Sequence, residues 1–153
     1  MKIAMFGHKR IPSREGGVEI VVEELASRMV KTGNEVTCFN RNGKGCVSQK
    51  YGKRYNFNGI EVKTVPTIDK KGMAAVTAAF FSSMLAAFGK YDIVHIHAEG
   101  PAFFFWIPKL FHKKIVVTVH GLDWQREKWK GGFGAKFIRK GEENAVKYAD
   151  EII

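Results

Sequence analysis

Short apolar segments alternate with longer helix-like segments along the chain, and this alternation constrains the fold more than any other feature. The apolar segments are predicted to be strands, at residues 3–7, 35–40, 60–65, 92–97, 115–120 and from 151 onward. The longer segments are predicted to be helices, at residues 17–32, 73–88, 101–111, 124–130 and 134–148. Strands that alternate with helices form a parallel sheet covered on both faces. The predicted fold class is therefore α/β, with a doubly wound parallel sheet.

Two segments depart from a simple strand or amphipathic-helix pattern. Residues 41–58 are polar, basic and glycine-rich, so we predict a surface loop. Residues 72–89 carry no charge and consist mostly of Ala, Ser, Thr and Gly with a few Phe and Met. Because this composition is only weakly hydrophobic, we predict a packed core helix at 73–88, with a membrane span as the alternative.

The net charge points to anionic partners. At 153 residues the chain is long enough for one domain with a substantial core. It carries 25 Lys and Arg against 15 Asp and Glu, a formal net charge of +10. Such an excess favours nucleic acids, phosphorylated small molecules or an acidic membrane surface. The charge does not choose among them, and a solvated basic face is the simplest alternative.

Cysteine content and the two termini bear on the compartment and the extent of the protein. The only cysteines are Cys38 and Cys46, so we expect neither a disulfide framework nor a zinc site, and a reducing cytoplasm. The first apolar segment is too short for a signal peptide, because charge returns at Lys9. Residues 151–153 look like the start of a strand, so we expect the chain to be part of something longer.

Residues with useful chemistry follow three of the predicted strands. Gly7 leads into the loop 8–17, His97 is followed by Glu99, and His120 is followed by Asp123. In an open doubly wound sheet, ligands bind beyond the carboxyl ends of the strands. If the strands are parallel, these residues lie along one edge, and we predict the ligand site there.

The first loop ends in two adjacent glycines, Gly16 and Gly17, at the start of a predicted helix. A helix N-terminus carries unpaired N–H groups and a partial positive charge, and glycine lets a phosphate approach the backbone. Neither the dinucleotide pattern G-x-G-x-x-G nor the Walker pattern is present. The pair is compatible with a simple tight turn, but the nearby Lys9, Arg10 and Arg14 favour an anion site.

Three histidines occur near the predicted site. His95 and His97 share one face of a strand, but no third ligand has a suitable spacing, so we expect no metal and no other cofactor. Such histidines commonly pack under a helix and bond to the backbone. His120 ends a buried strand and precedes the flexible Gly121, so a neutral imidazole there can exchange hydrogen bonds with a sugar hydroxyl. The alternative for His120 is a capping role.

Aromatic residues cluster in two further places. Trp124 and Trp129 alternate with Arg126, Lys128 and Lys130, a pattern that suits base stacking, sugar rings, a membrane interface or ordinary helix packing. Residues 103–106, Phe-Phe-Phe-Trp, are predicted to be core unless they prove exposed.

The sequence resembles the N-terminal domain of family-4 retaining glycosyltransferases of the GT-B fold, in particular the rhamnosyltransferase-like subgroup of bacterial polysaccharide synthesis. The segments that carry the resemblance are 16–19 (GGVE), 92–97 (DIVHIH), 119–129 (VHGLDWQREKW) and 148–153 (YADEII). It covers nearly the whole chain, and 119–129 is its most specific part. The loop departs from the family's usual pattern at Arg10, where a small residue is usual, and at Glu15, where an aromatic is usual.

The resemblance implies an enzyme of two Rossmann-like halves, of which residues 1–153 form the first, acceptor-side half. The second half, with a glutamate motif that this sequence lacks, would hold most of a nucleotide-sugar donor, so we expect the chain to be inactive alone. The acceptor would be a glycan or a lipid-linked molecule, with peripheral contact to the inner membrane face. The expected roles are His120 and Asp123 in catalysis, Gly16, Gly17 and Arg14 at the donor phosphates, and His97, Glu99 and Arg126 at the acceptor.

Two other function classes stay open from the residues alone. One is a non-catalytic Rossmann-like module that binds a nucleotide or NAD. The other is a nucleic-acid binder that uses the basic surface, although we expect no nucleic-acid partner. Titration with nucleotide-sugars against NAD separates the first, and salt-dependent binding to oligonucleotides identifies the second.

Overall fold

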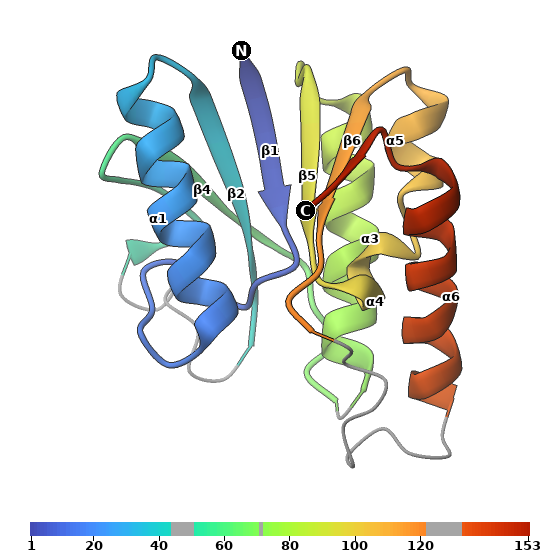
Figure 1. Ribbon diagram of the computed structural model, residues 1–153. Coiled ribbons are helices and arrows are strands. Elements are labelled where there is room, and N and C mark those ends of the chain that lie inside the picture. Colours follow the sequence, from blue (N-terminus) through green and yellow to red (C-terminus); the bar gives the residue numbers. More distant parts are fainter. Residues whose placement is uncertain (44–50, 71, 122–132) are drawn as a thin grey trace.

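The fold is built on one seven-stranded sheet (Figure 1). The computed structural model describes residues 1–43, 51–70, 72–121 and 133–153. Along the sheet the strands follow the order β3-β4-β2-β1-β5-β6-β7. Their bounds are β1 Lys2–Phe6, β2 Glu35–Arg41, β3 Arg54–Phe57, β4 Ile60–Val65, β5 Ile93–His97, β6 Lys114–Thr118 and β7 Glu151–Ile152. All pairings are parallel except that of β3 with β4.

Helices cover both faces of the sheet, as the strand–helix alternation predicts. Their bounds are α1 Gly17–Lys31, α3 Met73–Phe88, α4 Glu99–Ala102, α5 Trp106–Leu110 and α6 Phe133–Tyr148. Helix α1 packs on one face through Val22 and Ala26. The other four helices lie on the opposite face (Figure 1), where Ala86 of α3, Ala102 of α4 and Ala145 of α6 belong to one core cluster. The arrangement is a doubly wound α/β fold.

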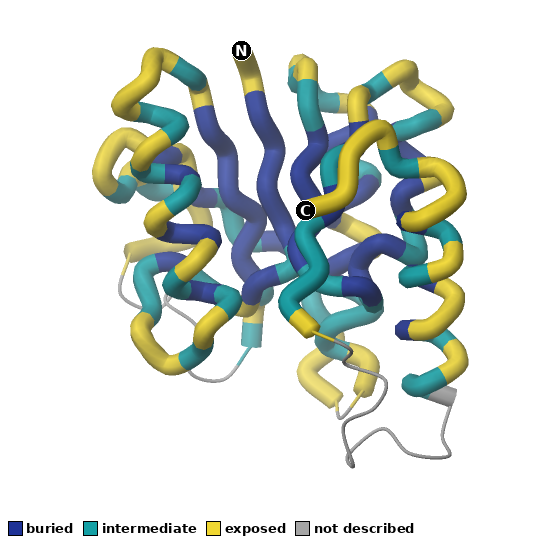
Figure 2. Tube along the Cα trace, viewed as in Figure 1, coloured by how far each residue is buried: buried dark blue, intermediate teal, exposed yellow. Residues whose placement is uncertain are grey.

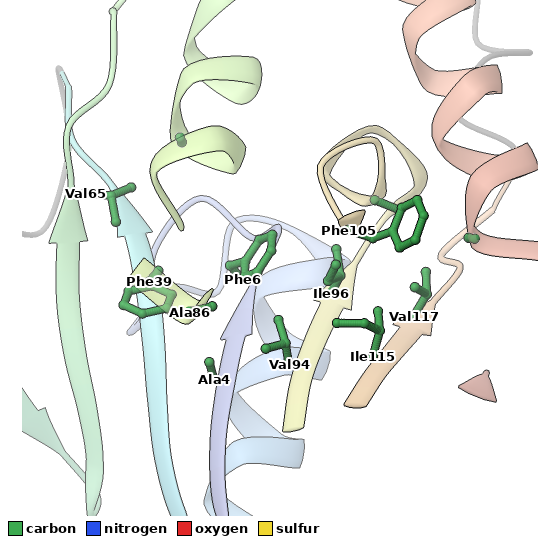
Figure 3. Close-up of a cluster of buried hydrophobic side chains, with 13 residues drawn as sticks. Ala4, Phe6, Phe39, Val65, Ala86, Val94, Ile96, Phe105, Ile115 and Val117 are labelled. Atoms are coloured by element: carbon green, nitrogen blue, oxygen red, sulfur yellow. The ribbon is translucent and has the colours of Figure 1, made fainter. Parts of the chain in front are cut away.

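The core consists of two layers, one on each side of the sheet. Because side chains alternate along a strand, Ala4 and Phe6 of β1 point toward α3, whereas Ile3 and Met5 point toward α1. Figure 3 shows the α3 layer, with Phe6 close to Ile96 and Ala86. Figure 2 shows that the central strands are buried along most of their length. Burial on both faces explains why these strands are continuous apolar segments.

The predicted helix at 101–111 is wrong in one respect, because it is two short helices, α4 and α5. Pro108 has no N–H, and its ring crowds the carbonyl of Phe104 in a continuous helix. The amides of Phe103, Phe104 and Phe105 instead bond three residues back, at 3.1, 3.3 and 3.1 Å. Phe105 is buried as expected, but Trp106 is 47 % exposed, so the aromatic segment is only partly core.

The predicted loop at 41–58 is also partly wrong, since it contains the edge strand β3. Tyr55 of β3 pairs with Val62 of β4, and its side chain packs on the α1 layer. A four-residue edge strand with alternating half-buried positions leaves little signal in the sequence. The predicted helix at 124–130 and Cys46 lie outside the described residues. Cys38 is buried in β2, where burial raises the pKa of its thiol.

Helix α3 is a core helix on one side only. Its buried residues are all small, namely Ala78, Ala79, Ser82, Ser83, Ala86 and Ala87. Its exposed residues include large apolar side chains, namely Phe80, Phe81, Leu85 and Phe88, and Phe88 is 67 % exposed. No helix in the described ranges has both the length and the apolar character needed to cross a membrane.

Candidate functional site

The carboxyl ends of the parallel strands bring Gly7 and His97 into direct contact. Gly7 follows β1 with a φ of +117°, a conformation that side chains rarely adopt. A Cβ at Gly7 would lie 1.8 Å from the carbonyl oxygen of His97 at the end of β5. The two strand ends can approach this closely only because residue 7 is glycine.

Three histidine rings form a stack that runs from β5 to the end of β6. The rings of His95 and His97 are stacked with centroids 4.2 Å apart, and those of His97 and His120 with centroids 5.2 Å apart. His97 Nδ1 lies 3.0 Å from His120 Nε2, and His95 Nε2 lies 2.7 Å from Thr118 Oγ1. His95 and His97 are buried, whereas His120 is partly exposed. The structure therefore brings together His97 and His120, as the sequence predicted.

Burial keeps the inner histidines uncharged. It lowers the pKa of His95 to about 4, and burial together with the neighbouring His95 and His8 lowers the pKa of His97 to about 2. A neutral histidine has one N–H and one acceptor nitrogen. The Nε2 atom of His97 is buried with no hydrogen-bond partner in the described part of the chain. An orphaned acceptor costs less than an orphaned N–H, so the proton belongs on His97 Nδ1, which donates to His120 Nε2.

The histidine stack and the first loop lie on the same face of the sheet as well as at the same edge. Val94 and Ile96 belong to the core layer on the α3 side, so His95 and His97 point to the side of α1. Helix α1 begins at the carboxyl edge on that same side (Figure 1). Its N-cap is Gly16, and no side chain caps it within the described residues. The start of α1 and the histidine stack thus lie at the same edge and on the same face of the sheet.

The Glu19 carboxylate lies close to Gly16. A Cβ at Gly16 would lie 2.1 Å from Glu19 Oε2. Glu19 is 7 % exposed, and its Oε1 accepts a hydrogen bond of 2.9 Å from the backbone N–H of Lys9. A Cβ at Gly17 would meet nothing within 4 Å. Of the two glycines, Gly17 is the one that leaves open space at the helix start.

Two basic residues of the loop, Arg10 and Arg14, are paired locally. Arg14 Nη2 lies 3.0 Å from Glu23 Oε1, and Arg14 Nη1 lies 3.8 Å from Glu24 Oε1, so its guanidinium rests on the second turn of α1. Arg10 pairs with Glu15. The two positions at which the loop departs from the expected family pattern therefore compensate each other's charge. The structure does not bring Arg14 to the histidine stack.

Of the three remaining predicted site residues, Glu99 lies within the described part of the chain and two do not. Glu99 begins α4 and is 1 % exposed, immediately after Ala98, whose amide bonds to the Thr118 carbonyl at 3.0 Å. It lies behind the edge and not on its surface. Asp123 and Arg126 lie outside the described residues.

Three residues near the edge were missed by sequence reasoning. His8 Nε2 donates to Asn40 Oδ1 at 3.0 Å, and burial lowers the pKa of His8 to about 4. Arg41 donates to the Gly7 carbonyl at 3.2 Å. His8, Arg41 and Ser82 line a small hollow at this edge. The available signal was position, because His8 follows β1, and Asn40 and Arg41 end β2.

Within the residues described by the structure, no group of three or more His, Cys, Asp or Glu side chains could hold a metal ion. His95 and His97 are committed to Thr118 and His120. The expectation that the protein uses no metal stays a prediction.

Comparison with solved structures supports the fold. A sucrose-phosphate synthase from Thermosynechococcus elongatus matches with a TM-score of 0.75 and 15 % identity, over 99 % of this chain and 41 % of that one. An α-glucosyltransferase in complex with UDP and a 13-mer DNA matches with a TM-score of 0.53 and 18 % identity, over 99 % of this chain and 36 % of that one. The chain thus spans about two fifths of the length of these structures. At such low identity they show the fold, which is one Rossmann-like half of the GT-B type.

A search of curated protein sequences finds no match. The family model for glycosyltransferase family 4, in contrast, matches residues 15–153, which include α1, the histidine stack and every later element. The chain therefore belongs to glycosyltransferase family 4.

Proposed function

We propose that this domain is the acceptor-side half of a retaining glycosyltransferase, which moves a sugar from a nucleoside-diphosphate donor to a glycan or lipid-linked acceptor. One observation carries the proposal: His120, at the end of the stack, and the uncapped start of α1 share one edge and one face of the sheet. Sugar transfer requires a group at the reacting sugar and a positive site at the departing diphosphate, and this region offers both.

The start of α1 is suited to the diphosphate. Its free N–H groups and partial positive charge stabilise negative charge that builds up as the nucleoside diphosphate leaves. We assign the phosphate contact to Gly17, where the approach is open, with Gly16 beside it. The Glu19 carboxylate lies close to Gly16 and disfavours an anion there, so the contact falls on the outer side of the turn. Arg14 would join only by leaving Glu23.

The role of His120 follows from its hydrogen bond to His97. If His97 Nδ1–H donates to His120 Nε2, the proton of a neutral His120 is on Nδ1. That N–H can donate to a hydroxyl or ring oxygen of the donor sugar. His97 then acts as a positioning residue, because it fixes the ring and the tautomer of His120. Asp123 and Arg126 are the proposed acceptor contacts; Glu99 is buried behind the edge, so we do not propose it as a direct contact.

Finer assignments are proposals of the same kind. The UDP bound to the α-glucosyltransferase makes UDP-sugars the first donors to test. We retain the rhamnosyltransferase-like subgroup, a cytoplasmic location and the need for a second half as expectations from the sequence.

A donor panel tests the proposal. The complete protein is incubated with UDP-, GDP- and dTDP-sugars, and release of nucleoside diphosphate is measured in the presence of acceptor glycans. Titration with NAD runs in parallel. Turnover of one nucleotide-sugar is expected, whereas tight NAD binding with no turnover of any donor would favour a non-catalytic module.

Gly17→Ala tests the phosphate contact separately. Since a Cβ at Gly17 meets no protein atom within 4 Å, the variant should fold with unchanged stability. The added methyl group occupies the proposed phosphate position, so the donor KM should rise about tenfold, equivalent to about 1.4 kcal/mol. An unchanged KM would remove Gly17 from the site.

A further inference from the structure

The side chain of Asn40 is buried at the end of β2 and makes four hydrogen bonds. It is 2 % exposed and lies on the α1 side of the sheet, because Cys38, two residues earlier, packs in the α1 layer. Asn40 Oδ1 accepts from the backbone N–H of Ile11 and from His8 Nε2, both at 3.0 Å. Asn40 Nδ2 donates to the Ile11 carbonyl at 3.0 Å and to the Tyr55 hydroxyl at 2.9 Å. All four hydrogen-bonding positions of the amide are therefore used.

These bonds fix the middle of the first loop. The N–H and the carbonyl of Ile11 both bond to Asn40, and the hydroxyl of Tyr55 in β3 also donates to this carbonyl. The Ile11 side chain is fully buried in the core layer under α1. Nearby, the carbonyl of Lys9 accepts a bond of 2.8 Å from the backbone N–H of Arg41. The end of β2 thus holds the loop at two of its residues.

The loop in turn is bonded to the first two turns of α1. The backbone N–H of Lys9 donates to Glu19 Oε1 at 2.9 Å, and the backbone N–H of Ser13 donates to Glu23 Oε2 at 3.3 Å. Both carboxylates belong to buried residues of α1. Lys9 and Ser13 lie two residues before and two residues after Ile11. A continuous set of hydrogen bonds therefore connects the end of β2, the first loop and the start of α1.

We propose that Asn40 is a positioning residue for the donor diphosphate, because it holds the first loop and, through the loop, the first amides of α1. The role rests on the proposed function, in which Gly17 contacts the departing diphosphate. A buried network whose members are all hydrogen-bonded makes the groups that it holds rigid. A misplacement of about 1 Å at a reacting centre costs about a hundredfold in rate. Asn40 is itself buried, so its effect passes through the helix start and not through direct contact.

A second buried hydrogen bond of β2 supplies a matched control. Thr37 Oγ1 donates to Glu61 Oε2 at 2.9 Å, and Thr37 is 5 % exposed. Thr37 comes three residues before Asn40, and it lies on the opposite face of the sheet, because Phe39 packs in the α3 layer. Thr37→Val removes the hydroxyl at nearly constant volume. It therefore measures what the loss of a buried side-chain bond does away from the carboxyl edge.

Steady-state kinetics of the complete protein with its nucleotide-sugar test the proposal. Asn40→Ala should raise the donor KM about tenfold or more and change the acceptor KM less than about twofold. Tyr55→Phe, which removes one hydroxyl from the network and keeps the ring, should raise the donor KM about threefold. Thr37→Val should change both KM values less than about twofold. Combining Asn40→Ala with Gly17→Ala should add less than about twofold to the donor KM of Gly17→Ala alone, since both changes disturb one contact.

Limited digestion with trypsin tests the network without using activity. The first loop contains the cleavage sites Lys9, Arg10 and Arg14. In Asn40→Ala the loop should be cut about fivefold faster than in the wild type, because the bonds that hold it are lost. Thr37→Val should be cut at the wild-type rate. Circular dichroism establishes that the two variants are equally folded under the conditions of digestion.

The possible failures are distinguishable. Unchanged digestion of the loop in Asn40→Ala would overturn the network, and a donor KM within about twofold of wild type would overturn the positioning role. Multiplied effects in the double variant would show that Asn40 does not act through Gly17. If Asn40→Ala does not fold, Tyr55→Phe supplies the same kinetic and digestion comparisons. If the wild type turns over no nucleotide-sugar, the proposed function and this role fail together, whatever the digestion shows.

Discussion

Gly7 is the residue at which β1 and β5 approach most closely, and its replacement should be severe. In Gly7→Ala the new Cβ would lie 1.8 Å from the His97 carbonyl oxygen, in a backbone conformation that alanine rarely adopts. The conformation alone costs about 1–3 kcal/mol, and the collision with backbone adds to it. We expect a loss of at least about 3 kcal/mol in urea unfolding. Gly17→Ala is the matched control and should unfold like the wild type; equal stability of both variants would contradict the close approach.

The buried histidines predict how stability depends on pH. His8, His95 and His97 have folded pKa values of about 4, 4 and 2, below the usual 6.5. Between those values and 6.5, the unfolded chain binds protons that the folded chain does not. Stability is therefore fully present above pH 6.5 and falls as the pH drops below it, by roughly 1.4 kcal/mol per pH unit for each histidine.

Urea unfolding between pH 7 and pH 5 measures this effect. The pKa of Asp150 is lowered from its usual value by the hydrogen bond from the Ile115 amide and by Lys109, so the stabilisation from this carboxylate is lost only in more acid solution. A flat stability profile from pH 7 to pH 5 would contradict the burial of neutral histidines.

At the residue scale, the sequence predicted which residues lie at the carboxyl edge of the sheet better than it predicted the contacts that each residue makes there. His97 and His120 were predicted from their positions at strand ends, and they are in contact. The stacking with His95 and the bond from Lys9 to Glu19 were not predictable, because they depend on the distances between separate elements. The sequence predicted Arg14 to be available for phosphate, but in the structure it forms an ion pair with Glu23 of α1.

At the scale of elements, the packing of α6 on α4 predicts that Gly141→Ala destabilises the protein, whereas helix propensity alone predicts the opposite. Gly141 lies inside α6, where alanine would normally stabilise the helix by about 1 kcal/mol. A Cβ at Gly141 would, however, lie 2.0 Å from the Glu99 carbonyl oxygen of α4. Gly141→Ala should therefore destabilise the protein, by about 2 kcal/mol or more, since two helices must separate. Stabilisation in thermal unfolding would show that α4 and α6 are not in close contact.

The sequence predicted most elements within one or two residues because the parallel strands are buried on both faces and are continuous apolar segments. Sequence reasoning failed where a structural feature depends on contacts between separate helices and strands. The small β3 depends on pairing with β4, and the direction in which α3 turns its phenylalanines depends on the sheet. Composition alone made α3 a core helix, whereas contact with the strands falls on its Ala and Ser residues.

At the scale of the whole molecule, the fold separates two surfaces. The histidine stack and the start of α1 lie at the carboxyl edge of the sheet, whereas the exposed Phe88 and Phe111 precede the amino ends of β5 and β6. Membership of glycosyltransferase family 4 fits the first surface.

The central claim is that His120 acts at the reacting sugar, and turnover of the complete protein with its nucleotide-sugar tests it most directly. His120→Ala should lower kcat at least a hundredfold, about 2.7 kcal/mol, with little change in the donor KM. His112→Asn is the matched control, because His112 is exposed after α5, far from the edge, and asparagine tolerates its positive φ. This control should keep wild-type turnover. Near-normal turnover of His120→Ala would contradict the account.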